Sequence, residues 1–125
     1  MIGLGIDLCQ VERIEKAMAA HANFLSRYYT EGEQAYIAQR GSVGAQSAAA
    51  MFAAKEALLK AMGIGLSSGI SLREIGVCHD TNGAPCYKLT GAAADRLRSM
   101  GGGSVFLSLT HEGGMAAAVA IIERA

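Results

Sequence analysis

Two acidic residues lie in sequence surroundings where a carboxylate can do chemistry on phosphate. Asp7 stands in a short segment that has glycine at positions 3 and 5, and Glu56 stands among alanine and leucine residues in a longer segment. Two carboxylates that converge can hold Mg²⁺, which takes few protein ligands and fills its octahedral shell with water and substrate phosphate oxygens. If the fold brings Asp7 and Glu56 together, they are a candidate metal site.

Each acid also has an ordinary structural interpretation. Asp7 can cap the helix that follows it or point to water, since Asp is a preferred helix cap. Glu56 and Lys60 are four residues apart, and such a pair on a solvated helix face contributes only about 0.2–0.5 kcal/mol. Phe52 and Leu59 flank Glu56 on the same side of a helix, which favours a packed face. Spacing alone leaves both interpretations open.

The three histidines differ in their surroundings. His111 lies near the end of a predicted strand, just before a glycine turn. A histidine there can hydrogen-bond a phosphate or a hydroxyl group, but it can equally be a polar residue beside a turn. His21 and His79 have no supporting neighbours, so we expect both at the surface.

The chain has three cysteines, Cys9, Cys78 and Cys86, with no C-x-x-C pair. An odd set without such a pair, and the absence of a signal sequence, predict a reduced, cytoplasmic setting. All three lie on predicted strands without a basic neighbour to activate them. We therefore expect small buried hydrophobic residues rather than nucleophiles.

Two predicted elements must position the acids. Residues 2–9 alternate with period two, which predicts a strand. Its even positions are apolar and are expected to pack on a core, while the glycines and Asp7 share the other face. The longest predicted helix spans residues 45–62 and is closed by Gly63. If this helix packs across the glycine face of the strand, Asp7 and Glu56 converge.

The remaining segments complete an α+β pattern. Thr30 and Glu33 form a capping box that opens a helix ending near Gln39, and Thr90 is expected to cap a helix through Met100. The other predicted elements are a helix over residues 11–20, a loop over 64–71, strands over 72–79 and 84–89 joined tightly at Asn82-Gly83, and strands over 105–110 and 115–122 joined at Gly113-Gly114. This order predicts an antiparallel sheet with a long central helix.

Length and charge narrow the class of protein. The chain has 125 residues, which predicts a single domain over residues 1–125. Eleven basic and eleven acidic side chains cancel. This balance disfavours nucleic acid or a polybasic membrane contact as the partner, since both need net positive charge. No apolar run approaches the roughly 20 residues that would span a bilayer.

Three segments together resemble a known family. They are Gly5-Ile6-Asp7-Leu8, Phe52-Ala53-Ala54-Lys55-Glu56-Ala57 and Ser108-Leu109-Thr110-His111-Glu112. In this order they resemble the holo-acyl-carrier-protein synthases, the small bacterial-type 4'-phosphopantetheinyl transferases. The likeness extends from residue 2 to about residue 123 and includes an Asn82-Gly83-Ala84-Pro85 turn.

The resemblance implies a fold, a reaction and an assembly. The fold is the 4'-phosphopantetheinyl transferase fold, in one domain. The reaction moves the phosphopantetheine arm of coenzyme A to a serine of an apo-acyl carrier protein, with Mg²⁺, for fatty acid biosynthesis in the cytoplasm. It releases adenosine 3',5'-bisphosphate. The assembly is a homotrimer, with each coenzyme site in a cleft between subunits.

The resemblance also implies roles for single residues. Asp7 and Glu56 would bind Mg²⁺ with the pyrophosphate of the coenzyme, and Lys60 would neutralise the leaving phosphate. The proton of the carrier serine would pass to a metal-polarised water or to Glu56. The further coenzyme contacts would be His111, Arg40, Gly65, Gly83 and Pro85. The residues implied to meet the acidic carrier are Arg13, with Lys16 and Arg27.

One position departs from the family pattern. Met51 stands where the family usually has a basic residue, and the chain has no Lys or Arg between Arg40 and Lys55. Arg40 is then the remaining upstream contact for the 3'-phosphate of coenzyme A, with Arg73 or Lys88 as candidate substitutes.

The sequence leaves two alternative functions open. One is a non-catalytic module that binds a carrier or a nucleotide, and the other is a metal-dependent hydrolase of nucleotide pyrophosphates.

Overall fold

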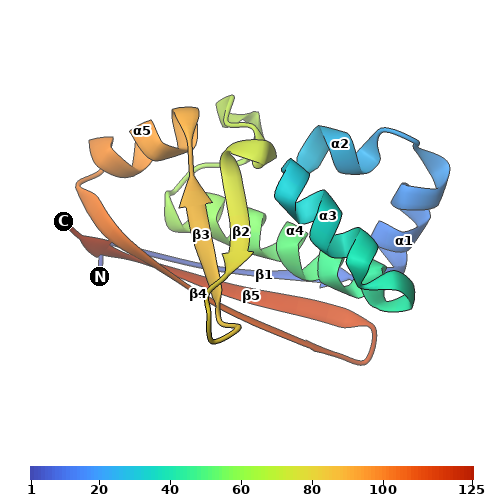
Figure 1. The fold of residues 1–125 in the computed structure, drawn as a ribbon. Helices are drawn as coiled ribbons and strands as arrows, with labels where there is room; N and C mark the ends of the chain where they lie inside the picture. The colour runs from blue at the N-terminus through green and yellow to red at the C-terminus, as the bar shows by residue number, and fades with distance from the viewer.

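A long helix lies across one face of a three-stranded antiparallel sheet. The protein is described here by a computed structural model that covers residues 1–125. The sheet has the order β1 (Gly3–Gln10), β5 (Met115–Arg124), β4 (Gly102–Glu112), and the helix is α4 (Gly44–Ala61). The two termini lie together at one end of this sheet (Figure 1). The predicted α+β class, with an antiparallel sheet packed against a long central helix, is confirmed.

Smaller elements surround α4 on the side away from the large sheet. Helices α1 (Val11–Ala20), α2 (Phe24–Tyr28) and α3 (Glu31–Gln39) gather at one end, and α5 (Gly91–Ser99) lies at the other (Figure 1). A second antiparallel sheet pairs β2 (Ile75–His79) with β3 (Pro85–Leu89). Short 3-10 turns cover Gly41–Val43, Leu66–Ser68 and Leu72–Glu74. None of the helices combines the length and apolarity needed to cross a membrane.

The contact between β1 and α4 depends on the absence of side chains. A Cβ atom on Gly5 would lie 1.9 Å from the carbonyl oxygen of Ala57, and one on Gly3 would lie 2.3 Å from that of Ala61. Neither position can therefore carry a side chain unless the backbones move apart. The rest of this contact is also built from small residues, all buried: Ala53, Ala54, Ala57 and Ala61 of α4, and Ala116, Ala118 and Ala120 of β5. The helix therefore packs on the glycine face, which is the condition under which we expect Asp7 and Glu56 to converge.

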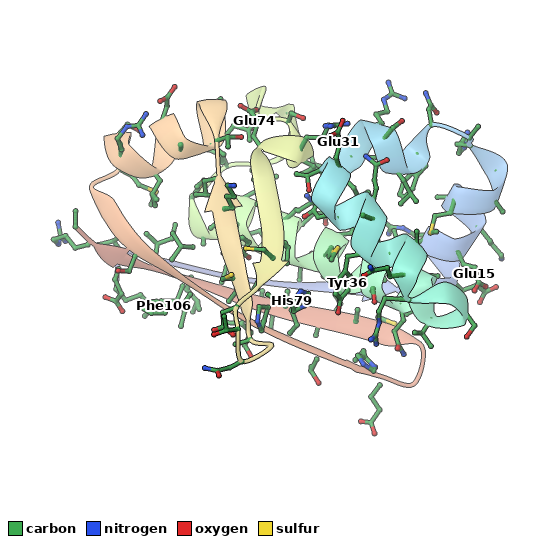
Figure 2. The ribbon with its side chains drawn as sticks, viewed as in Figure 1. Glu15, Glu31, Tyr36, Glu74, His79 and Phe106 are labelled. Atoms are coloured by element: carbon green, nitrogen blue, oxygen red, sulfur yellow. The ribbon has the colours of Figure 1, made fainter.

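The other face of β1 does not pack on the core, which corrects our expectation. Leu4, Ile6 and Leu8 are 59%, 60% and 63% exposed, because α4 covers the face that holds the glycines. The strand pairing puts Phe106 on the same side as Leu4, through Ile121. Figure 2 shows Phe106 on the side of the sheet opposite the helices. We call Leu4, Ile6, Leu8 and Phe106 the open face.

A buried ion pair joins α4 to α3 and β2. The Lys55 ammonium lies 2.8 Å from a Glu33 carboxylate oxygen, and both side chains are almost fully buried. Lys55 also donates hydrogen bonds to the carbonyl oxygens of Leu72 and Ile75, each at 2.8 Å. The second oxygen of Glu33 accepts a bond from the Val77 backbone at 2.7 Å. The capping box of Thr30 and Glu33 is confirmed, but its burial against Lys55 was not predicted.

The predicted β2–β3 hairpin is present but differs in detail. Its strands are joined by residues 80–84, one residue more than the predicted 80–83. Only Gly83 takes a positive φ, and the Asp80 carboxylate accepts bonds from the Asn82 and Ala84 backbones.

The start of α5 also differs from the prediction. The Thr90 side chain makes no cap hydrogen bond. The carboxylate of Glu74 instead accepts a hydrogen bond from the Ala92 backbone at 2.6 Å. A side chain distant in sequence therefore replaces the local cap. Strand 72–79 likewise begins as a 3-10 turn, α2 was not predicted, and β4 is longer than expected.

Adding one methyl group should affect the stability of the protein differently at two glycine positions, Gly5 and Gly32. Gly5→Ala should lower the free energy of unfolding by about 1–3 kcal/mol, because overpacking must be relieved by moving backbone. Gly32→Ala is the control, since its new methyl group on α3 meets no atom within 4 Å. It should leave stability unchanged or raise it by up to about 1 kcal/mol. Urea unfolding measures both, and equal effects would contradict the close contact of β1 with α4.

Candidate active site

Three charged residues meet where β1 crosses α4. Asp7 points from β1 toward the helix and is 9% exposed, while Glu56 is half-buried on α4. Lys60, one turn after Glu56, donates hydrogen bonds to the Asp7 carboxylate at 2.9 Å and to the Ile6 carbonyl at 3.0 Å. The fold thus brings together the three residues that the sequence picked out. We call Asp7, Glu56 and Lys60 the acidic site.

The ordinary interpretations of these residues do not describe the structure. Lys60 forms its ion pair with Asp7, on another element, rather than with Glu56 one turn away. Asp7 does not cap α1, since no side chain bonds to the first turn of that helix. Both acids instead face the crossing of strand and helix.

The electrostatics of the acidic site leave it short of positive charge. Burial raises the pKa of Glu56, and the nearby Asp7 carboxylate raises it further through its charge and a shared hydrogen bond. Arg13 and Lys60 oppose this increase. The hydrogen bond with Asp7 raises the pKa of Lys60, so this ammonium stays charged. Two carboxylates that influence one another in this way favour either a shared proton or an added cation.

The donor set fits a hard divalent cation. Both ligand groups are carboxylates, which Mg²⁺ prefers, and they come from two rigid elements. The structure contains no cluster of three or more His, Cys, Asp or Glu side chains arranged to hold a metal. Two protein ligands are what Mg²⁺ uses when substrate phosphate and water complete its shell. The acidic site therefore suits Mg²⁺ that binds together with a phosphate-bearing substrate.

A separate cavity of about 180 Å³ holds other predicted coenzyme contacts. Arg40, at the end of α3, and His111, near the end of β4, both line it. The rings of Tyr36 and His79 stack with centroids 4.7 Å apart, and Figure 2 shows them side by side on α3 and β2. The Arg40 guanidinium lies 5.8 Å from the Tyr36 ring centroid. We call this the basic cavity.

The remaining predicted coenzyme contacts lie outside the basic cavity. Pro85 begins β3 directly opposite His79, and Gly83 lies in the exposed turn just before it. Gly65 lies in the exposed segment after α4. None of the three acidic-site residues lines the basic cavity. Within one chain, the two groups of predicted site residues are therefore separate.

Met51 forms a wall between two cavities. It is 2% exposed and lines both the basic cavity and a larger neighbour of about 590 Å³. Arg73 and Lys88, the suggested substitutes for a basic residue at position 51, line only the larger cavity. His79 is exposed, as predicted, and also lines both cavities.

The predicted carrier-binding residues occupy different electrostatic settings. Arg13 is exposed on α1 and lies close enough to Glu56 to lower its pKa. Lys16 is already paired with Glu12 at 2.9 Å. Arg27 lies on α2, over the Tyr28 ring at 5.9 Å. Of the three, Arg13 is the cation that the structure links to the acidic site.

Comparisons with known proteins show which family the chain is similar to. A family profile described as the 4'-phosphopantetheinyl transferase superfamily matches residues 3–119. A holo-[acyl-carrier-protein] synthase of Treponema denticola is 45% identical over 123 residues, 98% of each chain. The crystal structure of the Neisseria meningitidis synthase superposes with a TM-score of 0.90 at 32% identity, covering 99% and 100% of the chains. A Bacillus anthracis synthase in complex with CoA (3',5'-ADP) superposes with a TM-score of 0.82 at 31% sequence identity, covering 99% of this chain and 97% of that chain.

The mutual influence of the two acids can be measured directly. Asp7→Asn removes a negative charge beside Glu56, so the pKa of Glu56 should fall toward its ordinary value. Arg13→Gln removes a positive charge and should raise the pKa of Glu56 further. NMR titration of the Glu56 carboxyl carbon measures these opposite shifts. If Asp7→Asn leaves the Glu56 titration unmoved, the two carboxylates do not share a site.

Proposed function

The chain belongs to the 4'-phosphopantetheinyl transferase superfamily, and we propose that it transfers the 4'-phosphopantetheine arm of coenzyme A to a serine of an apo-acyl carrier protein. The products are the holo-carrier and adenosine 3',5'-bisphosphate. Relatives at 39–45% identity over nearly the whole chain are named holo-[acyl-carrier-protein] synthase. The observation that carries the proposal is the convergence of Asp7, Glu56 and Lys60.

In this proposal Asp7 and Glu56 hold Mg²⁺. When bound, the ion would neutralise charge on the pyrophosphate of coenzyme A and help to orient it. The residues of the chain then have defined tasks. Lys60 stays charged beside Asp7, and its ammonium has a third donor for an oxygen of the leaving phosphate. Phosphoryl transfer needs mainly alignment and charge neutralisation, which these groups supply.

The carrier serine is the nucleophile, so no cysteine or serine of this chain is required to attack. The serine oxygen forms a bond to the phosphorus that carries pantetheine, and the bond to the bridging oxygen breaks. Adenosine 3',5'-bisphosphate departs with that oxygen. Glu56 is the acceptor that the chain itself offers for the serine proton, because its pKa is raised.

Arg13 is the proposed anchor for the carrier. It is exposed on α1, and its nearness to Glu56 would place a docked acidic helix beside the acidic site. Lys16 and Arg27 extend this basic surface, although Glu12 already neutralises Lys16. Because the chain has no net charge, attraction of an acidic carrier depends on such local cations.

The basic cavity is proposed to hold the nucleotide end of coenzyme A. Arg40 and His111 offer hydrogen-bond donors to phosphate there, and Gly83, Pro85 and Gly65 would contact the coenzyme nearby. Since the acidic site does not line this cavity, we place one coenzyme between the acidic site of one subunit and the basic cavity of the next.

A homotrimer is the proposed assembly. The open face exposes four large apolar side chains on a flat sheet, and exposed apolar patches of this kind mark contact surfaces. Burying them between subunits would remove apolar surface from water. We further propose that the carrier serves fatty acid biosynthesis and that the reaction takes place in the cytoplasm, a compartment that suits a chain whose three cysteines are free.

The transfer reaction can be followed on the carrier itself. With coenzyme A and Mg²⁺, the apo-carrier should gain the mass of one phosphopantetheine by intact-protein mass spectrometry. Asp7→Asn and Glu56→Gln should each slow transfer on the order of 10²-fold or more, since the metal site supplies several kcal/mol of charge stabilisation. Glu31→Gln, exposed on α3, is the matched control and should keep full activity. Coenzyme A binding without any mass gain would instead favour a non-catalytic module.

Subunit mixing tests whether the site lies between chains. Asp7→Asn damages the acidic site and His111→Ala damages the basic cavity, so each variant alone should be impaired. When the two variants are mixed in equal amounts and exchange subunits, about a quarter of the sites in a closed ring should combine two intact halves. Adding Ile6→Asp to both variants should disrupt the open face, reduce the mass measured by light scattering and abolish the recovery. No recovery from well-mixed trimers would contradict a shared site.

A further inference from the structure

Cys78 and Cys86 face each other across the β2–β3 sheet. Their Cα atoms are register partners, and their sulfur atoms are 3.0 Å apart. Cys78 is exposed and Cys86 is half-buried, whereas Cys9 is buried elsewhere in the core. The expectation that all three cysteines are small buried hydrophobic residues is therefore wrong for two of them. No step of the proposed transfer uses this pair.

The register fixes the geometry of the pair. The backbone N–H of Asp80 donates a hydrogen bond to the carbonyl oxygen of Ala84, and the backbone N–H of Thr90 donates one to the carbonyl oxygen of Glu74. Because hydrogen-bonded and non-hydrogen-bonded pairs alternate along an antiparallel ladder, Cys78 and Cys86 form a hydrogen-bonded pair. Such a pair has Cα atoms about 5.5 Å apart, inside the range of about 4.4–6.8 Å that a disulfide spans. The two sulfurs need to approach by only about 1 Å to reach bonding distance.

We propose that Cys78 and Cys86 are a redox-active dithiol that forms a reversible intramolecular disulfide by exchange with a low-molecular-weight disulfide. The Cys78 thiolate attacks one sulfur of the small disulfide, forming a mixed disulfide and expelling one small thiolate. The Cys86 thiolate then attacks the Cys78 sulfur and expels the second. The two protein thiol protons end on the two small thiols, and two electrons pass from the protein to the reagent.

The order of these steps follows from exposure and from the pair's own hydrogen bond. Cys78 is the exposed partner, so it meets the reagent first. A hydrogen bond with Cys78, and secondly burial, raise the pKa of Cys86 to about 11. Cys86 is therefore the less reactive thiol toward a reagent in solution, but it lies beside the Cys78 sulfur that it must attack. Intramolecular attack at this distance has the advantage of proximity.

The dithiol lies beside the basic cavity. His79, which lines that cavity, follows Cys78, and Pro85, opposite His79, precedes Cys86. A bond between the sulfurs would cross-link the two strands at this register and limit how far His79, which stacks on Tyr36, can move to accommodate a ligand. The expected effect on activity rests on the proposed function. Oxidation should raise the KM for coenzyme A. It should change kcat by less than about twofold, because the acidic site lies on other elements.

Thiol counting tests the dithiol without any use of transferase activity. The reduced protein is incubated with oxidised and reduced glutathione at a series of ratios, quenched with acid and alkylated in denaturant. Mass spectrometry should then show the loss of two alkylation sites, and digestion should yield a peptide cross-linked between Cys78 and Cys86. Dithiothreitol should restore all three thiols. Cys9→Ser is the matched control and should form the same cross-link.

Variants that each lack one of the two facing cysteines separate the competing outcomes. Cys86→Ser should stop at a glutathione mixed disulfide on Cys78, and Cys78→Ser should react more slowly than Cys86→Ser. Each of three results would overturn the proposal. They are three alkylated thiols at every ratio, a mixed disulfide as the end product of the unmodified protein, and a disulfide between two copies of the chain on a non-reducing gel. An unchanged KM for coenzyme A in the fully cross-linked protein would overturn its link to the basic cavity alone.

Discussion

The close contact between the glycine face of β1 and the alanine face of α4 is the constraint on which the rest of the structure depends. With no side chain at Gly3 or Gly5, the carbonyl oxygens of Ala57 and Ala61 approach the strand backbone directly. The next inward position on β1 is Asp7, so its carboxylate is delivered to the helix turn that holds Glu56 and Lys60. The contact that closes the core is therefore also the contact that builds the acidic site.

The buried pair of Lys55 and Glu33 fixes the other side of the same helix. Isolated charges in the interior cost several kcal/mol each, so Lys55 is tolerated only because Glu33 and two carbonyl groups satisfy it. Lys55 and Glu56 are consecutive, and consecutive side chains on a helix differ in direction by about 100°. Holding Lys55 toward α3 and β2 thus leaves Glu56 turned toward β1. A rotation of α4 that moved Glu56 would leave a buried ammonium without partners.

Much of this arrangement was visible in the sequence, and the failures have physical causes. Alanine content and Gly63 predicted the long helix, and the glycines of the first strand indicated a face that another backbone could approach closely. Period-two alternation shows that a strand has two faces but does not say which one the core covers, so the open face was assigned to the interior. Glu33 was fully explained by its local capping box, which concealed its pairing with Lys55, 22 residues away. The stacking of His79 on Tyr36 and the facing of the two cysteines depend on strand register, which no local pattern fixed.

A chain without net charge has to bind two anionic substrates, and the structure indicates how it does so. Positive charge is divided between Lys60 and Arg13 beside the acids, and Arg40 in the basic cavity. The Asp7 carboxylate raises the pKa of Glu56, and a pair of carboxylates of this kind suits a divalent cation that binds together with a phosphate-bearing substrate. None of the acidic-site residues lines the basic cavity. In our proposal a second subunit therefore completes the site, and the uncovered apolar face of the sheet is the surface by which it would do so.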